Sequence, residues 1–298
     1  MSVLIANAPV TWGVWGPHSL PAGRTPRDIL SALQKAGYDG VELGPLGFFG
    51  PDAAGTVATL DEFGLRSAGA YVPLRPLHGP EVMAADIEGL RAVCATLAAF
   101  PQSGPVILAE ETEPEIKKHV MRGTRHPELD LNAGQWKVLI EGMNDAARIA
   151  ADYGLMVSYH PHTGTHVEQP HEVDRLLEGS ELSMTLDTGH AAAGGDDPLD
   201  LLARWGDRVN HIHIKNVAMA PVRAASEDGR VFGMADASTR LDAGDLDLAA
   251  FMRALGRQNY RGWIVVEQDR RPDGGHDHAA VDAEQQENLH WVRARADW

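Results

Sequence analysis

Short apolar runs alternate with helical segments along the 298 residues of this chain. The runs have the length of buried strands, and several of the helical segments between them begin near a proline or stop at a glycine. Strands that alternate with helices imply parallel pairing through right-handed crossovers. Eight such units fit a single (β/α)₈ TIM barrel domain spanning residues 1–298. A doubly wound open sheet is the second choice, because the Gly-rich phosphate loop that normally begins such a sheet is absent.

The same pattern predicts where each element lies. We expect strands at Val3–Ala8, Tyr38–Leu43, Arg66–Val72, Pro105–Ala109, Gly154–Tyr159, Leu182–Leu186, Val209–Ile214 and Gly262–Val266. We expect helices at Pro26–Ala36, Val57–Phe63, Pro80–Phe100, Gln135–Tyr153, Pro170–Glu178, Pro198–Trp205, Leu246–Leu255 and Val281–Arg295. Two polar stretches, Arg122–Gly134 and Ala220–Asp242, are predicted to be a loop over the barrel mouth and a long insertion.

Composition narrows the class of partner. The net charge of −16 argues against nucleic acid or an anionic membrane surface. The single cysteine, Cys94, rules out an internal disulfide and disfavours a cysteine metal cluster. No segment approaches the roughly 18 apolar residues of a membrane span, and the N-terminus lacks the features of a signal peptide. We therefore expect a cytoplasmic protein with a small-molecule substrate; Trp291 and Trp298 leave a homo-oligomer open.

The last four predicted strands each end in side chains that bind metals. In a (β/α)₈ barrel the C-terminal ends of the strands surround one mouth, where active sites lie. Taken singly, these residues have ordinary explanations, such as a turn or helix cap for the aspartate and a hydrogen bond inside the barrel for a histidine. Their repetition at four successive strand ends favours one metal site for Mn²⁺, Co²⁺, Mg²⁺ or Zn²⁺. The side chains are His160 and His162, Asp187 and His190, His211 and His213, and Glu267.

Six motifs carry a family resemblance. They are Ala8-Pro-Val-Thr-Trp12-Gly, Gly37-Tyr-Asp-Gly-Val-Glu42, Tyr159-His-Pro-His162-Thr-Gly-Thr165, Leu186-Asp-Thr-Gly-His190, His211-Ile-His213-Ile-Lys215 and Val266-Glu267. Together they resemble the xylose isomerase-like TIM barrels, most closely the inosose dehydratase branch of the sugar isomerase/epimerase family. The resemblance implies a divalent metal, with Mn²⁺ or Co²⁺ favoured, held by His160, Asp187, His213 and Glu267. It also implies that His190 contacts substrate hydroxyls.

One departure from the family pattern bears on the reaction. Ketose 3-epimerases of this superfamily carry glutamates at the first and last ligand positions and exchange a proton between them, whereas here the first position is His160. This departure favours a reaction in which one base removes a proton next to a carbonyl and a β-hydroxyl leaves. We therefore predict a metal-dependent dehydratase of a keto-cyclitol or keto-sugar such as an inosose. A ketose 3-epimerase or sugar isomerase, and a non-catalytic sugar-binding barrel, are the alternatives; the acidic charge disfavours an endonuclease-type barrel.

Roles for further residues follow from their positions around the expected mouth. His190, Glu267 and Lys215 are predicted to handle protons or to orient the substrate. Lys215 and Arg75 are equally well explained as ion-pair partners, and Trp12 as a cover for the barrel end. The predicted substrate-binding residues are Glu42, Trp12, Arg75, His162 and Arg223, with Arg230 and Arg240 as further anion or hydroxyl binders in the insertion.

Overall fold

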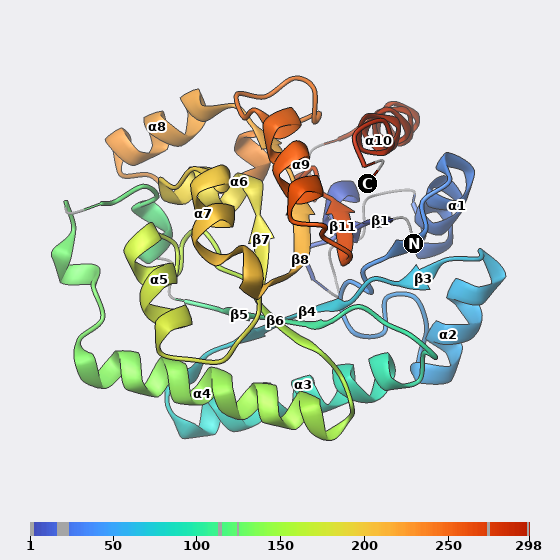
Figure 1. Cartoon of the computed structure of the whole chain (residues 1–298). Helices are drawn as coiled ribbons and strands as arrows, with labels where there is room; N and C mark the ends of the chain where they lie inside the picture. Colours follow the sequence, from blue (N-terminus) through green and yellow to red (C-terminus); the bar gives the residue numbers. More distant parts are fainter. Residues whose placement is uncertain (1–2, 17–23, 113–114, 124, 273–274, 297) are drawn as a thin grey trace.

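The computed structural model describes residues 3–16, 24–112, 115–123, 125–272, 275–296 and 298. In these residues a curled parallel sheet is surrounded by helices, which confirms the predicted (β/α)₈ barrel (Figure 1). The strands of the sheet are β1 (Leu4–Asn7), β2 (Gly40–Val41), β3 (Arg66–Ser67), β4 (Ala70–Leu74), β5 (Val106–Glu110), β6 (Val157–Tyr159), β7 (Met184–Asp187), β8 (Val209–Ile214) and β11 (Trp263–Val266). The α-helices are α1 (Pro26–Ala36), α2 (Ala53–Glu62), α3 (Pro80–Ala98), α4 (Ala133–Asp152), α5 (Pro170–Glu178), α6 (Thr188–Gly194), α7 (Pro198–Trp205), α8 (Met219–Asp228), α9 (Leu248–Arg257) and α10 (His278–Arg293).

Local sequence signals set where these helices begin. Thr25 and Asp28 form a capping box at the start of α1, and Asn132 and Gln135 form another at the start of α4. The helices α3 and α4 contact each other along one side of the barrel, at the lower margin of Figure 1. In the described part of the chain, no helix combines the length and apolar character needed to cross a membrane.

The barrel closes between β3 and β4, which are two parts of one bent strand. The sheet runs in the order β3-β2-β1-β11-β8-β7-β6-β5-β4, so β3 pairs with β2 while β4 pairs with β5. At the bend, the Ala68 N–H donates to the carbonyl of Val41, and the Gly104 N–H donates to the carbonyl of Ser67, both at 2.9 Å. The predicted single strand Arg66–Val72 is therefore bent in the middle, and its two parts complete the ring.

Two glycines permit this bend. Gly69 has a φ of 129°, which residues with a side chain rarely adopt. A Cβ atom on Gly104 would lie 1.8 Å from the carbonyl oxygen of Ala68, so only glycine allows the two backbones to approach this closely. The bend and the close approach together hold the ends of the sheet in register.

The two faces of a strand separate core residues from site residues. On β8, Ile212 and Ile214 are buried in the hydrophobic core, while His211 and His213 alternate with them and reach Glu42 beyond β2. Both imidazoles therefore lie on one face of the strand, as predicted. The polar side chains of the site thus point into the barrel.

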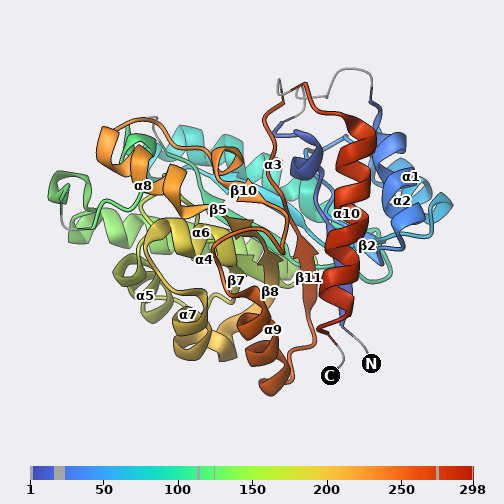
Figure 2. The same ribbon diagram turned by 90° about the horizontal axis from the view of Figure 1, so that it is seen from above.

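The structure corrects two sequence expectations. No helix was expected directly after the strand Leu182–Leu186, but α6 begins there, immediately after β7, and contains Gly189. The stretch 220–242 is not simply a polar insertion: α8 packs on α6, and β10 (Ser238–Thr239) pairs antiparallel with β9 (Asn216–Val217) (Figure 2). Apolar residues of the insertion, including Phe232 and Met234, form a separate cluster with Ala193 of α6. Their irregular spacing hides this cluster in the sequence.

We predict that Gly104→Ala destabilises the protein by about 1–3 kcal/mol, because the new methyl group must push apart the backbones that close the barrel. Gly89→Ala in α3 is the matched control: a Cβ there meets nothing within 4 Å, and alanine in a helix is worth about 0.5–1 kcal/mol over glycine. Urea denaturation of both variants measures the difference. Equal stability of the two variants would contradict this account of barrel closure.

Candidate active site

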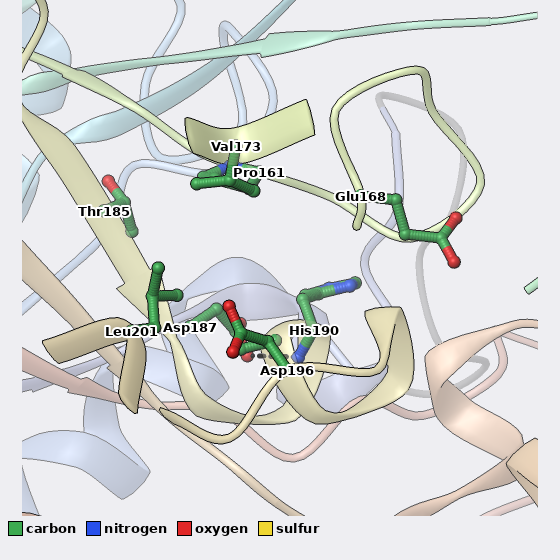
Figure 3. Close-up of a pocket in the computed structure, with 9 residues that line it drawn as sticks. Pro161, Glu168, Val173, Thr185, Asp187, His190, Asp196 and Leu201 are labelled. Atoms are coloured by element: carbon green, nitrogen blue, oxygen red, sulfur yellow. Dashed lines mark hydrogen bonds between the residues drawn. The ribbon is translucent and has the colours of Figure 1, made fainter. Parts of the chain in front are cut away.

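Asp187 is the last residue of β7 and also the N-cap of α6. Its Oδ1 accepts hydrogen bonds from the backbone N–H of Gly189 at 2.8 Å and from that of His190 at 2.9 Å; Figure 3 shows Asp187 and His190. Its Oδ2 is buried and accepts no hydrogen bond from any described residue. This second oxygen lies 3.8 Å from Nε2 of His160 and 3.6 Å from Nδ1 of His213. The helix-cap explanation therefore accounts for only one of the two oxygens.

A carboxylate orients His213. Nε2 of His213 lies 2.8 Å from Oε1 of Glu42, and Nε2 of His211 lies 2.9 Å from the same oxygen. Burial by itself raises the pKa of Glu42, but the two imidazoles hold that pKa well below its ordinary value. The ionised carboxylate accepts both bonds, so Nδ1 of His213 is the nitrogen directed toward Asp187.

Nδ1 of His213 is a strong cation-binding position. It is buried, has no hydrogen-bond partner in the described part of the chain, and lies 3.4 Å from Oε2 of Glu267. Burial lowers the pKa of His213, but the carboxylates of Glu267 and Glu42 raise it well above its ordinary value. A nitrogen that holds a proton this firmly also attracts a metal cation, which replaces the proton on binding.

His160 directs its other ring nitrogen at the same place. Its Nδ1 lies 2.7 Å from the carbonyl oxygen of Pro161, which can only accept, so Nδ1 carries the proton. Burial holds the pKa of His160 well below its ordinary value, so the ring is neutral. The lone pair of His160 is therefore on Nε2, the nitrogen nearest Asp187.

These atoms form a candidate metal centre. One ligand atom each from His160, Asp187 and His213 lie within 4.8 Å of one another, and all three residues are buried. Two of the atoms, Asp187 Oδ2 and His213 Nδ1, accept or donate no hydrogen bond among the described residues, and the nearest cation to Oδ2 is the Lys215 ammonium at 3.3 Å. A mixed set of imidazole and carboxylate ligands fits a divalent metal ion.

Two other clusters of histidine and carboxylate side chains lie among the described residues, but their side chains already bond to one another or to an arginine. In the cluster of Glu42, His211 and His213, hydrogen bonds join the carboxylate to both rings. The cluster of Asp130, His171 and Glu172 is largely exposed, and the Glu172 carboxylate already pairs with a buried arginine. Neither has the converging unpartnered atoms of the candidate metal centre.

The motif Asp187-Thr-Gly-His190 also positions Lys215. The Thr188 hydroxyl donates to the carbonyl of Lys215 at 2.7 Å and accepts from its N–H at 2.9 Å. A Cβ atom on Gly189 would lie 2.8 Å from Cδ of Lys215, so glycine leaves room for the lysine side chain. Each residue of the motif thus has a distinct structural task.

The Lys215 ammonium lies among three carboxylates. Its Nζ is 2.8 Å from Oδ1 of Asp269, 3.0 Å from Oε2 of Glu267 and 3.3 Å from Oδ2 of Asp187. Burial lowers the pKa of Lys215, but the carboxylates raise it well above its ordinary value. Burial raises the pKa of Glu267 to about 7, against the opposing effects of His213 and Lys215. Oε2 of Glu267 thus contacts both the Lys215 ammonium, at 3.0 Å, and Nδ1 of His213, at 3.4 Å.

Two further histidines lie beside this centre. The rings of His162 and His190 lie at a tilt with centroids 3.9 Å apart, and the ring of His160 is 5.4 Å from the first and 5.2 Å from the second. The ring of Tyr71 on β4 lies 6.3 Å from those of His160 and His162. The structure thus brings the predicted histidines together around Asp187.

A buried ion-pair network holds the loop that carries His162. Arg122 pairs with Glu172 at the start of α5 and lies 3.5 Å from Oε2 of Glu168. The Glu168 carboxylate accepts from the N–H of Met121 at 3.0 Å and from the N–H of Gly164 at 2.7 Å. The loop after β6 is therefore joined to the loop after β5 by hydrogen bonds and buried charges.

The same loop packs tightly against α6. A cavity of ≈ 10 Å³ lies between them, and Glu168, Asp187 and His190 are among the residues that line it (Figure 3). This volume is enough for about one water molecule. At the end of α6, a Cβ atom on Gly194 would lie 2.2 Å from the carbonyl oxygen of Glu168, so glycine permits this close packing of the loop.

Three predicted substrate-binding residues do not join the centre. Arg75 forms an ion pair with Asp86, so it has the ion-pair role that the sequence allowed as the alternative to substrate binding. Arg223 is exposed on α8. Trp12 is buried and donates from Nε1 to Oδ1 of Asp282 at 3.0 Å, so it covers the barrel end beside α10. The insertion residues Arg230 and Arg240 pair with nearby carboxylates as well.

Several residues of the site were not predicted. Asp269 lies two positions after Glu267 at a strand end, and residues at this spacing in an extended segment point to the same side. This spacing could have indicated that Asp269 belongs to the site. The only sequence indication for Tyr71 was its position within a predicted strand, which is a weaker signal. Thr163 and Arg122 gave no signal, because their roles depend on contacts between segments distant in sequence.

Comparison with known proteins agrees with this architecture. The family model described as xylose isomerase-like TIM barrel matches residues 30–295. The inosose dehydratase of Halalkalibacterium halodurans is 31% identical over 285 residues, covering 91% of this chain and 91% of the relative. The rhizopine catabolism protein MocC of Rhizobium meliloti is 31% identical over 287 residues, covering 93% of this chain and 84% of the relative.

Solved structures share the fold at lower identity. The 3-keto-D-glucoside 4-epimerase YcjR from E. coli superposes with a TM-score of 0.69 at 17% identity, covering 98% of this chain and 99% of that one. The probable 3-DHS dehydratase AsbF from Bacillus anthracis superposes with a TM-score of 0.66 at 14% identity, covering 97% and 99%. The family match and the sequence relatives extend over nearly the whole barrel. This chain belongs to the xylose isomerase-like TIM barrel family.

Proposed function

We propose that this chain is a divalent-metal-dependent lyase that removes water from a keto-cyclitol or keto-sugar such as an inosose. The convergence of buried ligand atoms from His160, Asp187 and His213, in a chain 31% identical to an inosose dehydratase, carries the proposal. We assign Glu267 as the fourth ligand, since its Oε2 lies 3.4 Å from Nδ1 of His213. The mixed ligand set suits Mn²⁺ or Co²⁺, with Mg²⁺ or Zn²⁺ as alternatives.

A divalent ion held by these residues would polarise the substrate ketone as a Lewis acid. In the proposed reaction Glu267 removes a proton from the carbon next to the ketone, and the C–H electron pair forms the new C=C bond. The C–O bond at the neighbouring carbon breaks, and the hydroxyl leaves as water with the proton that Glu267 returns. Lys215 steadies Glu267 through the contact at 3.0 Å and orients the substrate.

Glu42 has a different role in this proposal from the predicted one. Its Oε1 already accepts hydrogen bonds from His211 and His213, and its side chain is buried. We therefore assign Glu42 to positioning His213 rather than to substrate binding. The predicted substrate contacts that remain are His162 and His190.

A ketose 3-epimerase or sugar isomerase using the same residues is the alternative reaction. Two-sided proton exchange needs a second base on the opposite face of the substrate. The residue at that position, His160, has Nδ1 bonded to Pro161 and Nε2 directed toward Asp187, so neither nitrogen is free to serve as that base. This arrangement supports dehydration over epimerisation.

The first test is Asp187→Asn, which we expect to remove metal and activity while keeping the fold, because asparagine caps helices as well as aspartate. The control is Asp197→Asn, which changes the N-cap of α7 in the same way. Metal analysis should find roughly one Mn²⁺ or Co²⁺ per chain in the wild type and in the control, and little in Asp187→Asn. Mass spectrometry of reactions with inososes and ketoses should show loss of one water from substrate.

Other outcomes of this test separate the alternatives. A product of unchanged mass and altered stereochemistry would establish an epimerase or isomerase. Ligand binding without turnover would establish a non-catalytic sugar-binding barrel. A wild-type protein that holds no divalent metal even after reconstitution would show that the assigned ligand set is wrong.

Lys215→Met should tighten metal binding roughly tenfold or more, because the ammonium repels a cation bound to Asp187 and Glu267. The same change should destabilise the metal-free protein by about 3–5 kcal/mol, since it leaves buried carboxylates unpaired. Isothermal titration with Mn²⁺ and thermal unfolding measure the two effects. Lys137→Met on the exposed face of α4 controls for loss of a lysine. Weaker or unchanged metal affinity would refute this role for Lys215.

A further inference from the structure

We infer that His162 and His190 present one hydrogen-bond acceptor and one hydrogen-bond donor, side by side, to the substrate, and that Thr163 fixes this polarity. The inference rests on the proposed function and specifies the group that the site recognises: a ketone oxygen beside a hydroxyl. The evidence is the set of hydrogen-bond partners at the Nδ1 atoms of these two neighbouring rings.

The partners of His190 determine its tautomer. The backbone N–H of Thr163 lies 3.2 Å from Nδ1 of His190 and can only donate. Nδ1 therefore carries no proton, and the neutral ring carries its proton on Nε2. The Thr163 hydroxyl, 2.8 Å from the same nitrogen, donates as well.

His162 is held in the opposite tautomer by the same residue. Its Nδ1 lies 2.9 Å from the carbonyl oxygen of Thr163, which can only accept. Nδ1 of His162 therefore carries the proton, and Nε2 carries the lone pair. One residue, Thr163, thus donates to one ring through its N–H and accepts from the other ring through its carbonyl.

Both Nε2 atoms are available to a ligand. Neither has a hydrogen-bond partner in the part of the chain that the structure describes, and neither is among the fully buried polar atoms. The ring centroids are 3.9 Å apart with an interplanar angle of 36°, so the two groups lie close together. A ligand that reaches them meets a lone pair on His162 and an N–H on His190.

This polarity matches an α-hydroxy ketone. A substrate hydroxyl donates to Nε2 of His162, and the adjacent ketone oxygen, which has no proton to give, accepts from Nε2 of His190. Nε2 of His190 already carries a proton, so His190 cannot take a proton from the substrate there. Its predicted catalytic role narrows to that of an uncharged donor that stabilises negative charge on the substrate oxygen, as a neutral histidine does in triosephosphate isomerase.

The first test is ¹⁵N-edited NMR of the histidine rings in protein kept diamagnetic, either metal-free or with Zn²⁺. The signals that disappear in His162→Gln and His190→Gln assign the two residues. We expect a protonated Nε2 in His190 and a protonated Nδ1 in His162. The same tautomer in both rings, or a doubly protonated ring at neutral pH, overturns the inference. Since no turnover is needed, this result is independent of whether the protein dehydrates an inosose.

The second test addresses Thr163. Thr163→Val should shift the Nδ1 signal of His190 and lower kcat/KM for the ketone substrate roughly three- to tenfold. Thr163→Ser, which keeps the hydroxyl, should restore both. Thr165→Val removes a hydroxyl that bonds to the His162 carbonyl in the same loop and should leave the His190 signal in place. An unchanged His190 signal in Thr163→Val would show that the hydroxyl does not help to fix this ring.

Discussion

The geometry of the site depends on the different contacts of the two carboxylate oxygens of Asp187: Oδ1 caps α6, and Oδ2 faces His160 and His213. Two backbone N–H groups of α6 fix Oδ1, and the planarity of the carboxylate then fixes Oδ2. Strand β7 and helix α6 share this residue with no linker between them, so the position of Oδ2 is set by main-chain geometry. A ligand atom held in this way needs no further ordering when a cation binds.

The histidines of the site follow a common rule: one ring nitrogen has a fixed partner, and the other is left for chemistry. The fixed partners are of two kinds. A carboxylate or a backbone carbonyl accepts from His213, His160 and His162, whereas a backbone N–H donates to His190. The first kind leaves a lone pair on His160 and His162, and on His213 a proton that a cation would replace; the second kind leaves a proton on His190. For His160, His162 and His190 the chain thus uses backbone groups, which cannot titrate, to set which rings accept and which donates.

The sequence was sufficient to predict the eight-strand alternation and the approach of His160, Asp187 and His213, because parallel strands bring their C-terminal ends to one mouth. It did not reveal α6, whose alanine-rich turns lack a polar face that marks a helix. It also did not distinguish the roles of similar residues: Arg75 and Arg122 are both arginines in polar loops, but one pairs on the surface and the other is buried. Such differences arise from contacts between distant segments, which a one-dimensional pattern does not contain.

The buried network around Arg122 has a consequence for redesign of this barrel. Loops of (β/α)₈ enzymes are commonly treated as modules that can be exchanged one at a time to alter specificity. Here Arg122 belongs to one loop, while Glu168 and Glu172 belong to the next loop and its helix, with all three side chains nearly inaccessible. Replacing either loop alone would leave a buried charged side chain without its ion-pair partner. The two loops therefore have to be exchanged together, and a set of variants that changes one loop must also change the other.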